Sequence, residues 1–193
     1  MSNYNIKKTI NTNLLNISLG YTKKKSNNFL SYILLGVLHN NVIIDLNQTL
    51  KSFNIMLNFI EDLIQNKGII LFIGTDNVLL NKLIKNLANK YNQLYVDYNQ
   101  NINLDIIPDA IFSFNNNNIF INNLNIPLLS IIDTKDSIKN LTYFVVANTK
   151  SFKLNLIYLY LIFNSILKGS LKTKINFYKD KQVFSEKEKY LIL

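Results

Sequence analysis

The 193-residue sequence contains no cysteine, no arginine and no tryptophan, and it has a single histidine, His39. Without cysteine, a disulfide scaffold, a cysteine-ligated zinc, an iron–sulfur cluster and thiol catalysis are all excluded. One histidine leaves almost nothing for a histidine metal site, so we expect neither a metal nor a cofactor. His39 is followed by two asparagines and is interpreted as a loop hydrogen-bonder rather than a catalytic base.

Charged residues are also scarce, at 17%, whereas hydrophobic residues make up 48%. A chain this apolar can bury enough surface to offset its conformational entropy, so we expect it to fold, and its length fits one domain. All 21 basic residues are lysines, opposed by 12 acids, and the net charge of +9 indicates an anionic partner such as nucleic acid or a lipid surface. Few glycines and prolines beside abundant Asn, Ile, Leu and Lys are typical of an AT-rich gene.

The positive charge is concentrated at the two ends of the chain. Residues 1–30 carry five lysines and no acid, and residues 150–193 carry nine lysines against three acids, while the middle is nearly neutral. We therefore predict a basic N-terminal segment (1–30), a single α/β domain (31–169) and a Lys-rich C-terminal extension (170–193). Lysine-rich ends are typical of a chain whose ends bind nucleic-acid phosphates, because each phosphate that a lysine neutralises releases counterions. The lysines could also simply keep the ends of the chain soluble.

No signal peptide or Arg-rich transit segment is visible in the sequence. The most apolar run, from Leu154 to Leu167, would span about 21 Å as a helix at ~1.5 Å per residue, short of the ~30 Å of a bilayer core. We interpret it as a buried core helix and expect no membrane span. A membrane-associated protein is the less favoured reading.

The spacing of apolar residues predicts strands alternating with helices. The apolar run Val42–Ile44 ends at Asp45. Apolar residues then recur every three or four positions, which predicts an amphipathic helix. We expect Asp45 or Asn47 to cap its start and Gly68, in a left-handed conformation, to end it. The apolar stripe of this helix comprises Leu46, Leu50, Phe53, Leu57, Ile60 and Ile64. A second helix is expected to contain Val78, Leu79, Leu83, Leu87 and Tyr91.

Five further apolar runs are predicted to be strands buried on both faces, as parallel strands are. They are Ile69–Ile73, Leu94–Val96, Ala110–Phe112, Leu128–Ile132 and Tyr143–Val146. A last helix from about Lys150 to Lys168 should end at Gly169 and turn Leu154, Ile157, Leu161 and Ile166 toward the sheet. The pattern predicts a three-layer α/β sandwich with a mostly parallel central sheet and helices on both faces.

Catalytic motifs are weak. Gly74, Thr75 and Asp76 form a strand-to-helix turn like that of nucleotide-binding folds, but neither G-x-G-x-x-G nor G-x-x-x-x-G-K-[ST] occurs in the chain. Asp133 and Asp136 lack the spacing and partners of known carboxylate enzymes and are interpreted as turn or cap residues. We expect no enzyme activity, and the alternative is a doubly wound nucleotide-binding enzyme domain.

Several strings, in order, carry a resemblance to a known family. NVIIDLNQT at 41–49 and KGIILFIGT at 67–75 are followed by PDAIF at 108–112, NIP at 125–127 and IIDT at 131–134. Their sequence and separation resemble ribosomal protein S2 of the small subunit over about residues 19 to 170. The resemblance implies a flavodoxin-like domain that binds small-subunit rRNA near the head–body junction, supports assembly and translation, contacts neighbouring ribosomal proteins and is not a homo-oligomer.

The sequence also departs from the family pattern. Only about ten residues separate Asp97 from Pro108, where the family usually carries a long helical hairpin. The N-terminal "G-x-HFGH" is reduced to a segment that keeps Gly20 and loses both histidines. These losses, with the AT-rich bias, resemble a reduced organelle-encoded copy; we expect the mitochondrial matrix and its ribosome, with a plastid as the alternative.

RNA contacts are assigned to lysines of the two ends and to one aromatic residue. Tyr21 lies beside a lysine cluster and could stack on an exposed base or, equally, anchor a loop to the core. The predicted RNA-binding residues are Lys7, Lys8, Tyr21, Lys23, Lys24, Lys25, Lys150, Lys153, Lys172 and Lys174.

Overall fold

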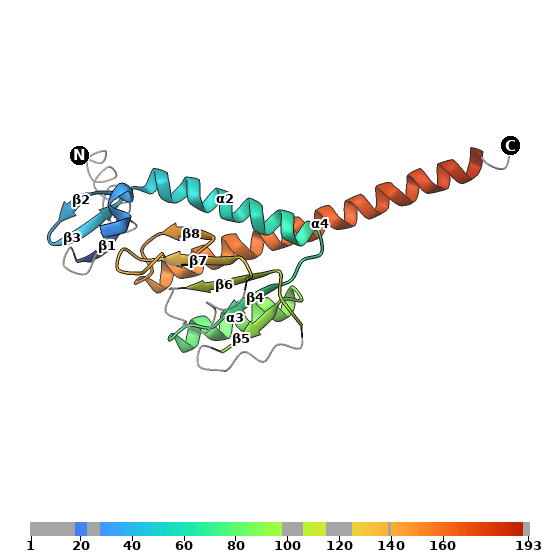
Figure 1. The fold of residues 1–193 in the computed structure, drawn as a ribbon. Helices are drawn as coiled ribbons and strands as arrows, with labels where there is room; N and C mark the ends of the chain where they lie inside the picture. Colours follow the sequence, from blue (N-terminus) through green and yellow to red (C-terminus); the bar gives the residue numbers. More distant parts are fainter. Residues whose placement is uncertain (1–17, 23–27, 98–105, 115–124, 139, 191–193) are drawn as a thin grey trace, which may run out of the picture.

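The chain folds around two β-sheets, as the computed structural model shows (Figure 1). The structure describes residues 18–22, 28–97, 106–114, 125–138 and 140–190. The larger sheet has five parallel strands in the order β5-β4-β6-β7-β8. Their bounds are β4 Ile70–Ile73, β5 Leu94–Val96, β6 Ala110–Phe114, β7 Leu128–Ile132 and β8 Tyr143–Val146.

The strand order confirms the predicted fold class. The chain starts at β4 inside the sheet, adds β5 on one side and then returns across β4 to add β6, β7 and β8 on the other. This is the flavodoxin-like order, in which the direction of winding reverses between β4 and β6. All five predicted parallel strands are present, and β6 and β7 are buried along their whole length, as their continuous apolar composition predicts.

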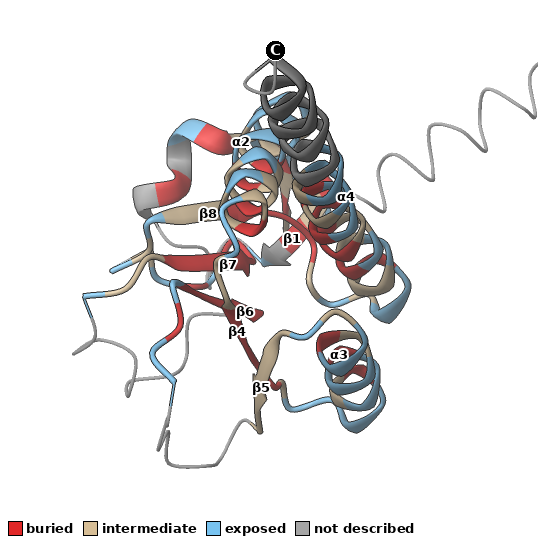
Figure 2. Ribbon diagram, turned by 90° about the vertical axis from the view of Figure 1, so that its right-hand side faces the viewer, coloured by how far each residue is buried: buried red, intermediate tan, exposed pale blue. Residues whose placement is uncertain are grey.

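The two faces of the sheet carry unequal layers. Three α-helices pack on one face: α2 (Leu46–Gln65), α3 (Val78–Lys90) and α4 (Phe152–Tyr190). Phe72 of β4 stacks on Phe163 of α4 with ring centroids 4.9 Å apart, at the centre of this main core. Figure 2 shows α3 and α4 on the same side of the strands, with α2 beside α4.

The opposite face is covered, among the described residues, by a short 3-10 helix and loops. The 3-10 helix η2 (Asn28–Ile33) places Leu30 and Ile33 against Ile132 of β7 and Val146 of β8. Alternate residues of the same strands therefore face the α-helices and η2, as the period of two requires. The expected α/β sandwich is confirmed: three α-helices cover one face, and η2 is the helical element on the other face among the described residues, over the ends of β7 and β8.

A small antiparallel sheet precedes the parallel one. It has the order β1-β3-β2, with β1 at Leu19–Thr22, β2 at Leu34–Leu38 and β3 at Asn41–Ile44. The predicted run Val42–Ile44 is thus a strand, but it belongs to this sheet and not to the parallel one. His39 and Asn40 form the β2–β3 turn and both have positive φ. Because β1 lies within residues 1–30, the folded structure begins before residue 31.

The ends of α2 are set by side-chain and backbone hydrogen bonds. Asp45 caps the start, as predicted, because its Oδ1 accepts from the backbone N of Asn47 at 2.9 Å. The predicted left-handed stop at Gly68 is wrong: Lys67 takes the positive φ of 63°, and no glycine in the described residues has a positive φ. Gly68 instead closes the helix end by donating its N–H to Leu63 O at 2.9 Å.

Helix α4 does not end at Gly169, so the predicted stop there is wrong as well. It continues to Tyr190, and its distal part extends beyond the sheet (Figure 1). Gly169 serves close packing, because a Cβ at this position would lie 2.6 Å from the backbone O of Glu61 in α2. The glycine therefore lets two helices approach, and the residues after 170 continue the helix.

The buried side of α4 differs from the predicted one in part. Leu154 and Ile166 are buried as expected and Leu161 is partly buried, whereas Ile157 is exposed. The remaining buried apolar residues are Leu159, Ile162 and Phe163. Among the described residues, the segment Phe152–Ile175 of α4 is long and apolar enough to cross a membrane, and a third of that window, 33%, is buried in the fold.

Candidate nucleic-acid interface

The carboxyl ends of β7 and β8 hold a buried polar cluster. Asp133 follows β7, and its Oδ1 accepts from the backbone N of Thr134 at 2.6 Å and from the Thr134 hydroxyl at 3.1 Å. Its Oδ2 accepts from the backbone N of Thr149 at 3.4 Å. Asp136 Oδ2 accepts from the backbone N of Asp133 at 2.8 Å. Both aspartates organise the turn after a strand, which confirms their predicted structural role.

Burial determines the charge properties of this cluster. Asp133 and Asp136 are 0% and 5% exposed, and burial raises the pKa of both carboxyls above the usual value. The hydrogen bonds from Thr134 and then the charge of Lys150 oppose this change at Asp133 but do not outweigh it. Both carboxyls accept hydrogen bonds from backbone N–H groups of the turn, an arrangement typical of a structural turn.

Lys150 connects this cluster to the small sheet. Its Nζ donates to the backbone O of Gly20 in β1 at 2.9 Å, and its charge acts on Asp133. Gly20 itself lies against Thr134, because a Cβ there would be 2.6 Å from Thr134 Cγ2. The backbone of β1 is thus held on the carboxyl ends of the parallel strands by a lysine and a threonine that are more than 100 residues away in sequence.

We call the contact of Gly20 in β1 with Thr134 and Lys150 the β1 junction. The predicted RNA-binding residues of the N-terminal segment lie close to it or before it in the sequence. Tyr21 is in β1, next to the Gly20 whose carbonyl binds Lys150; its side chain is outside the described part of the structure. Lys23, Lys24 and Lys25 come directly after Thr22, the last residue of β1, and lie outside the described residues, as do Lys7 and Lys8. The fold places Gly20 of β1 at the carboxyl end of the parallel sheet, and the lysine cluster follows β1 in the sequence.

The C-terminal predicted lysines divide into two groups. Lys150 lies just before α4 and Lys153 lies in its first turn, at the same end of the molecule as β1, and both residues are exposed. Lys172 and Lys174 are also exposed but lie about 28 Å further along α4, at ~1.5 Å per residue. Lys172 forms an ion pair with Glu61 of α2, which raises the pKa of the lysine through a hydrogen bond and charge attraction. The structure brings together the first pair and the β1 junction and separates the second pair from them.

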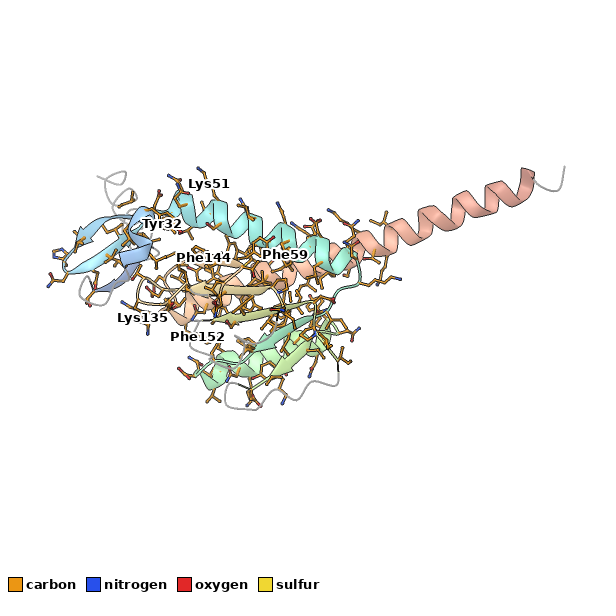
Figure 3. All side chains as sticks on the ribbon, in the orientation of Figure 1. Tyr32, Lys51, Phe59, Lys135, Phe144 and Phe152 are labelled. Atoms are coloured by element: carbon orange, nitrogen blue, oxygen red, sulfur yellow. The ribbon has the colours of Figure 1, made fainter. Side chains whose placement is uncertain are left out.

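Sequence reasoning missed Lys135. This exposed lysine lies between Asp133 and Asp136 and points away from the body at the end that carries the small sheet (Figure 3). Its charge lowers the pKa of Asp136, although burial still dominates there. The signal that could have found it was its position after an apolar strand, because loops at the carboxyl ends of parallel strands gather at one edge of the sheet.

The nucleotide-binding alternative is not favoured by the geometry. A crevice of about 150 Å³ lies between the tips of β4 and β6, below the ~300 Å³ at which ligand pockets usually begin. Asn155 lines it, and the buried Oδ1 of this residue has no hydrogen-bond partner. Lys150, the cation of the lining, already donates to Gly20 O. Gly74 continues the strand pairing by donating to Val96 O at 2.8 Å. No group of three metal-ligating side chains occurs within the described residues.

Comparison with known proteins shows a similarity to one family over part of the chain. The fold is a flavodoxin-like α/β sandwich with a basic edge, and the family model described as "Ribosomal protein S2" matches residues 15–101. That range includes the small sheet and the first two strands of the parallel sheet along the chain, β4 and β5.

Two relatives support the same family. The small ribosomal subunit protein uS2 of Mycoplasma genitalium is 36% identical over 58 residues, which are 30% of this chain and 20% of the relative. The uS2 protein of Marinobacter nauticus is 37% identical over 79 residues, which are 41% of this chain and 31% of the relative. The matched segments thus cover a fifth to a third of these relatives. The matches support the ribosomal S2 family for part of this chain, and the family model places that part at residues 15–101.

Proposed function

We propose that the chain is a member of the ribosomal protein S2 family and a structural constituent of the small ribosomal subunit, without enzyme activity. The observation that carries this proposal is the family match over residues 15–101, a range that contains the elements from β1 to β5. The names of both relatives describe small-subunit proteins. In this role the chain assists assembly and translation and contacts neighbouring small-subunit proteins, without forming a homo-oligomer.

The proposed RNA-binding surface is the end of the molecule at the carboxyl edge of the parallel sheet. Lys150 and Lys153 are exposed there, and the chain leaves β1 at Thr22 toward the cluster Lys23–Lys25. Lysine charges at one edge of a mostly neutral body suit phosphates, which are bound by charge without sequence readout. Lys172 and Lys174 would contact RNA at a second place, where phosphate competes with Glu61 for Lys172.

Ultraviolet crosslinking in isolated small subunits tests this surface. We expect peptides of this chain crosslinked to rRNA to contain Tyr21 to Lys25 and Lys150 to Lys153. Crosslinks confined to α3, whose lysines lie on the neutral middle segment, would contradict the proposed surface while leaving membership of the subunit intact.

The proposed location is the mitochondrial ribosome, with a plastid ribosome as the alternative. Support comes from the shortened segment between Asp97 and Pro108, the lost N-terminal histidines and the AT-rich composition. Immunoblots of purified mitochondria and plastids distinguish the two. We expect the chain in mitochondrial small subunits, and its presence in cytosolic ribosomes alone would overturn an organellar location.

A further inference from the structure

Within the part of the chain that the structure describes, β2 is an edge strand of the small sheet. In the order β1-β3-β2, the described strands pair with only one side of β2. Of its residues, Leu34 is partly buried and the other four are exposed. The hairpin of β2 and β3 lies at the end of the molecule opposite the distal part of α4 (Figure 1). One row of backbone hydrogen-bonding groups on β2 thus faces away from the described sheet.

Apolar side chains are exposed on both faces of this edge strand. Val37 is opposite Val42, and Leu38 is opposite Asn41. Residues opposite each other in an antiparallel pair lie on the same face, so Val37 and Leu38 mark the two different faces. They are 47% and 36% exposed, and Leu35, at the irregularity in the pairing, is 69% exposed. Tyr32 precedes the strand and is 65% exposed (Figure 3).

The edge lacks the residues with which monomeric proteins protect such strands. Charged side chains, above all lysine, and proline are among the means by which proteins prevent edge-to-edge pairing. Residues 26–44 contain no lysine, aspartate, glutamate or proline, although the chain as a whole is rich in lysine. A segment without cations has nothing with which to neutralise phosphate, so RNA does not fit this surface.

We propose that β2 pairs with an extended, mainly apolar segment of a neighbouring small-subunit protein, which adds a strand to the β1-β3-β2 sheet. This inference rests on the proposed ribosomal function. An added strand satisfies the backbone N–H and C=O groups along the edge, and its alternate side chains cover Val37 on one face and Leu38 on the other. A lipid surface covers apolar side chains but leaves the backbone groups of the edge unpaired. An edge strand without charge and with apolar side chains on both faces therefore favours a polypeptide strand as its partner.

Hydrogen exchange and site-directed crosslinking on the full chain test the pairing. Since the chain has no cysteine, Val37→Cys can carry a single benzophenone label, and Val78→Cys at the exposed start of α3 is the matched control. Labelled chains are incorporated into small subunits, which are then separated on a gradient. We expect Val37→Cys to crosslink to one extended apolar segment of a small-subunit protein that the control does not reach.

The second readout is the exchange rate of the Leu34–Leu38 amides in the free chain and in the particle. Strand addition should slow the outward-facing amides by about tenfold or more, because exchange then requires local opening. Cosedimentation without this protection, or crosslinks to rRNA, lipid or a second copy of this chain, would overturn the inference alone. A chain that sediments free of the particle overturns the proposed function and this inference together.

Discussion

At the scale of single residues, two glycines differ in how closely their backbone approaches a neighbouring side chain. Gly20 lies against the side chain of Thr134, which is completely buried at the end of β7. Gly36 in β2 has no atom within 4 Å of the position that a Cβ would occupy. Neither glycine has a positive φ, so the two sites differ in packing and not in backbone strain.

Gly20→Ala should therefore destabilise the fold by about 1–3 kcal/mol, the usual cost of overpacking a filled site. Gly36→Ala is the matched control and should be neutral or stabilise by about 0.4–1 kcal/mol through the lower entropy of the unfolded chain. Urea unfolding of the full chain measures both. Equal free energies of unfolding for the two variants would contradict the packing of β1 on Thr134.

The buried carboxyls predict a pH dependence at the same scale. Burial raises the folded-state pKa of Asp136 above the unfolded value of 3.8, so ionisation costs more in the folded protein. This contribution is unchanged below pH 3.8 and reduces stability as the pH rises through the folded pKa.

Asp136→Asn removes the ionisation and keeps an oxygen that can accept from the backbone N of Asp133. The stability of the variant relative to the wild type should increase as the pH rises from about 3.5 to about 7. Urea unfolding at several pH values measures the difference. A difference that stays constant or decreases with pH would show that the carboxyl is not held in a desolvating environment.

At the scale of elements, the strands are easier to predict than the helix ends. Continuous apolar runs such as Leu128–Ile132 identify a parallel strand because both of its faces are buried. The sequence predicts an end of α4 at Gly169 because glycine is the usual stop signal. The same residue serves the approach of α2, which is more than 100 positions away and is not visible in local sequence.

The buried faces of the helices also differ from the apolar faces that the sequence spacing predicts, for a related reason. Leu50 of α2 fits the apolar period but is exposed, and Met56, which is not in the predicted stripe, is completely buried. Helix orientation is fixed by the neighbouring helix and the sheet and not by spacing alone. The candidate site shows the same limit: the lysines can be named from the sequence, but the contact of Lys150 with Gly20 joins residues 130 positions apart.

Gly169→Ala gives a prediction in which two effects have opposite signs. In an isolated helix the change stabilises by about 1 kcal/mol, because alanine has the higher helix propensity. Here the new Cβ would lie 2.6 Å from Glu61 O and 2.9 Å from Ile64 Cβ, so α4 must move away from α2. We expect overpacking to prevail, with a net loss of about 1–2 kcal/mol in urea unfolding.

The control for this variant is Ser170→Ala, at the adjacent and only partly buried position. It loses one side-chain hydrogen bond to Leu167 O, worth about 1 kcal/mol or less, without moving the helices. A Gly169→Ala variant more stable than the wild type would show that the two helices are not held at this distance.

At the scale of the whole molecule, a nearly neutral α/β body carries lysine-rich ends. Neutralising phosphates with lysine makes RNA binding decrease with salt in proportion to the number of phosphates bound. The triple variant Lys23→Ala, Lys24→Ala and Lys25→Ala should lower the salt slope by about one unit for each phosphate that is no longer neutralised. Filter binding to small-subunit rRNA over a range of salt measures it.

The matched control replaces the three exposed lysines of α3, Lys82, Lys85 and Lys90, with alanine. The change in net charge is the same, and the lysines lie away from the β1 junction. An equal decrease in slope for both triple variants would show that general charge, and not the position of the Lys23–Lys25 cluster, attracts the RNA.

Sedimentation of the native chain tests the central claim most directly. If the chain is a structural constituent of the small subunit, it migrates with small-subunit rRNA on a sucrose gradient at moderate salt and is released as the salt is raised. A chain that remains at the top of the gradient at moderate salt, while the small subunits are intact, would contradict the claim.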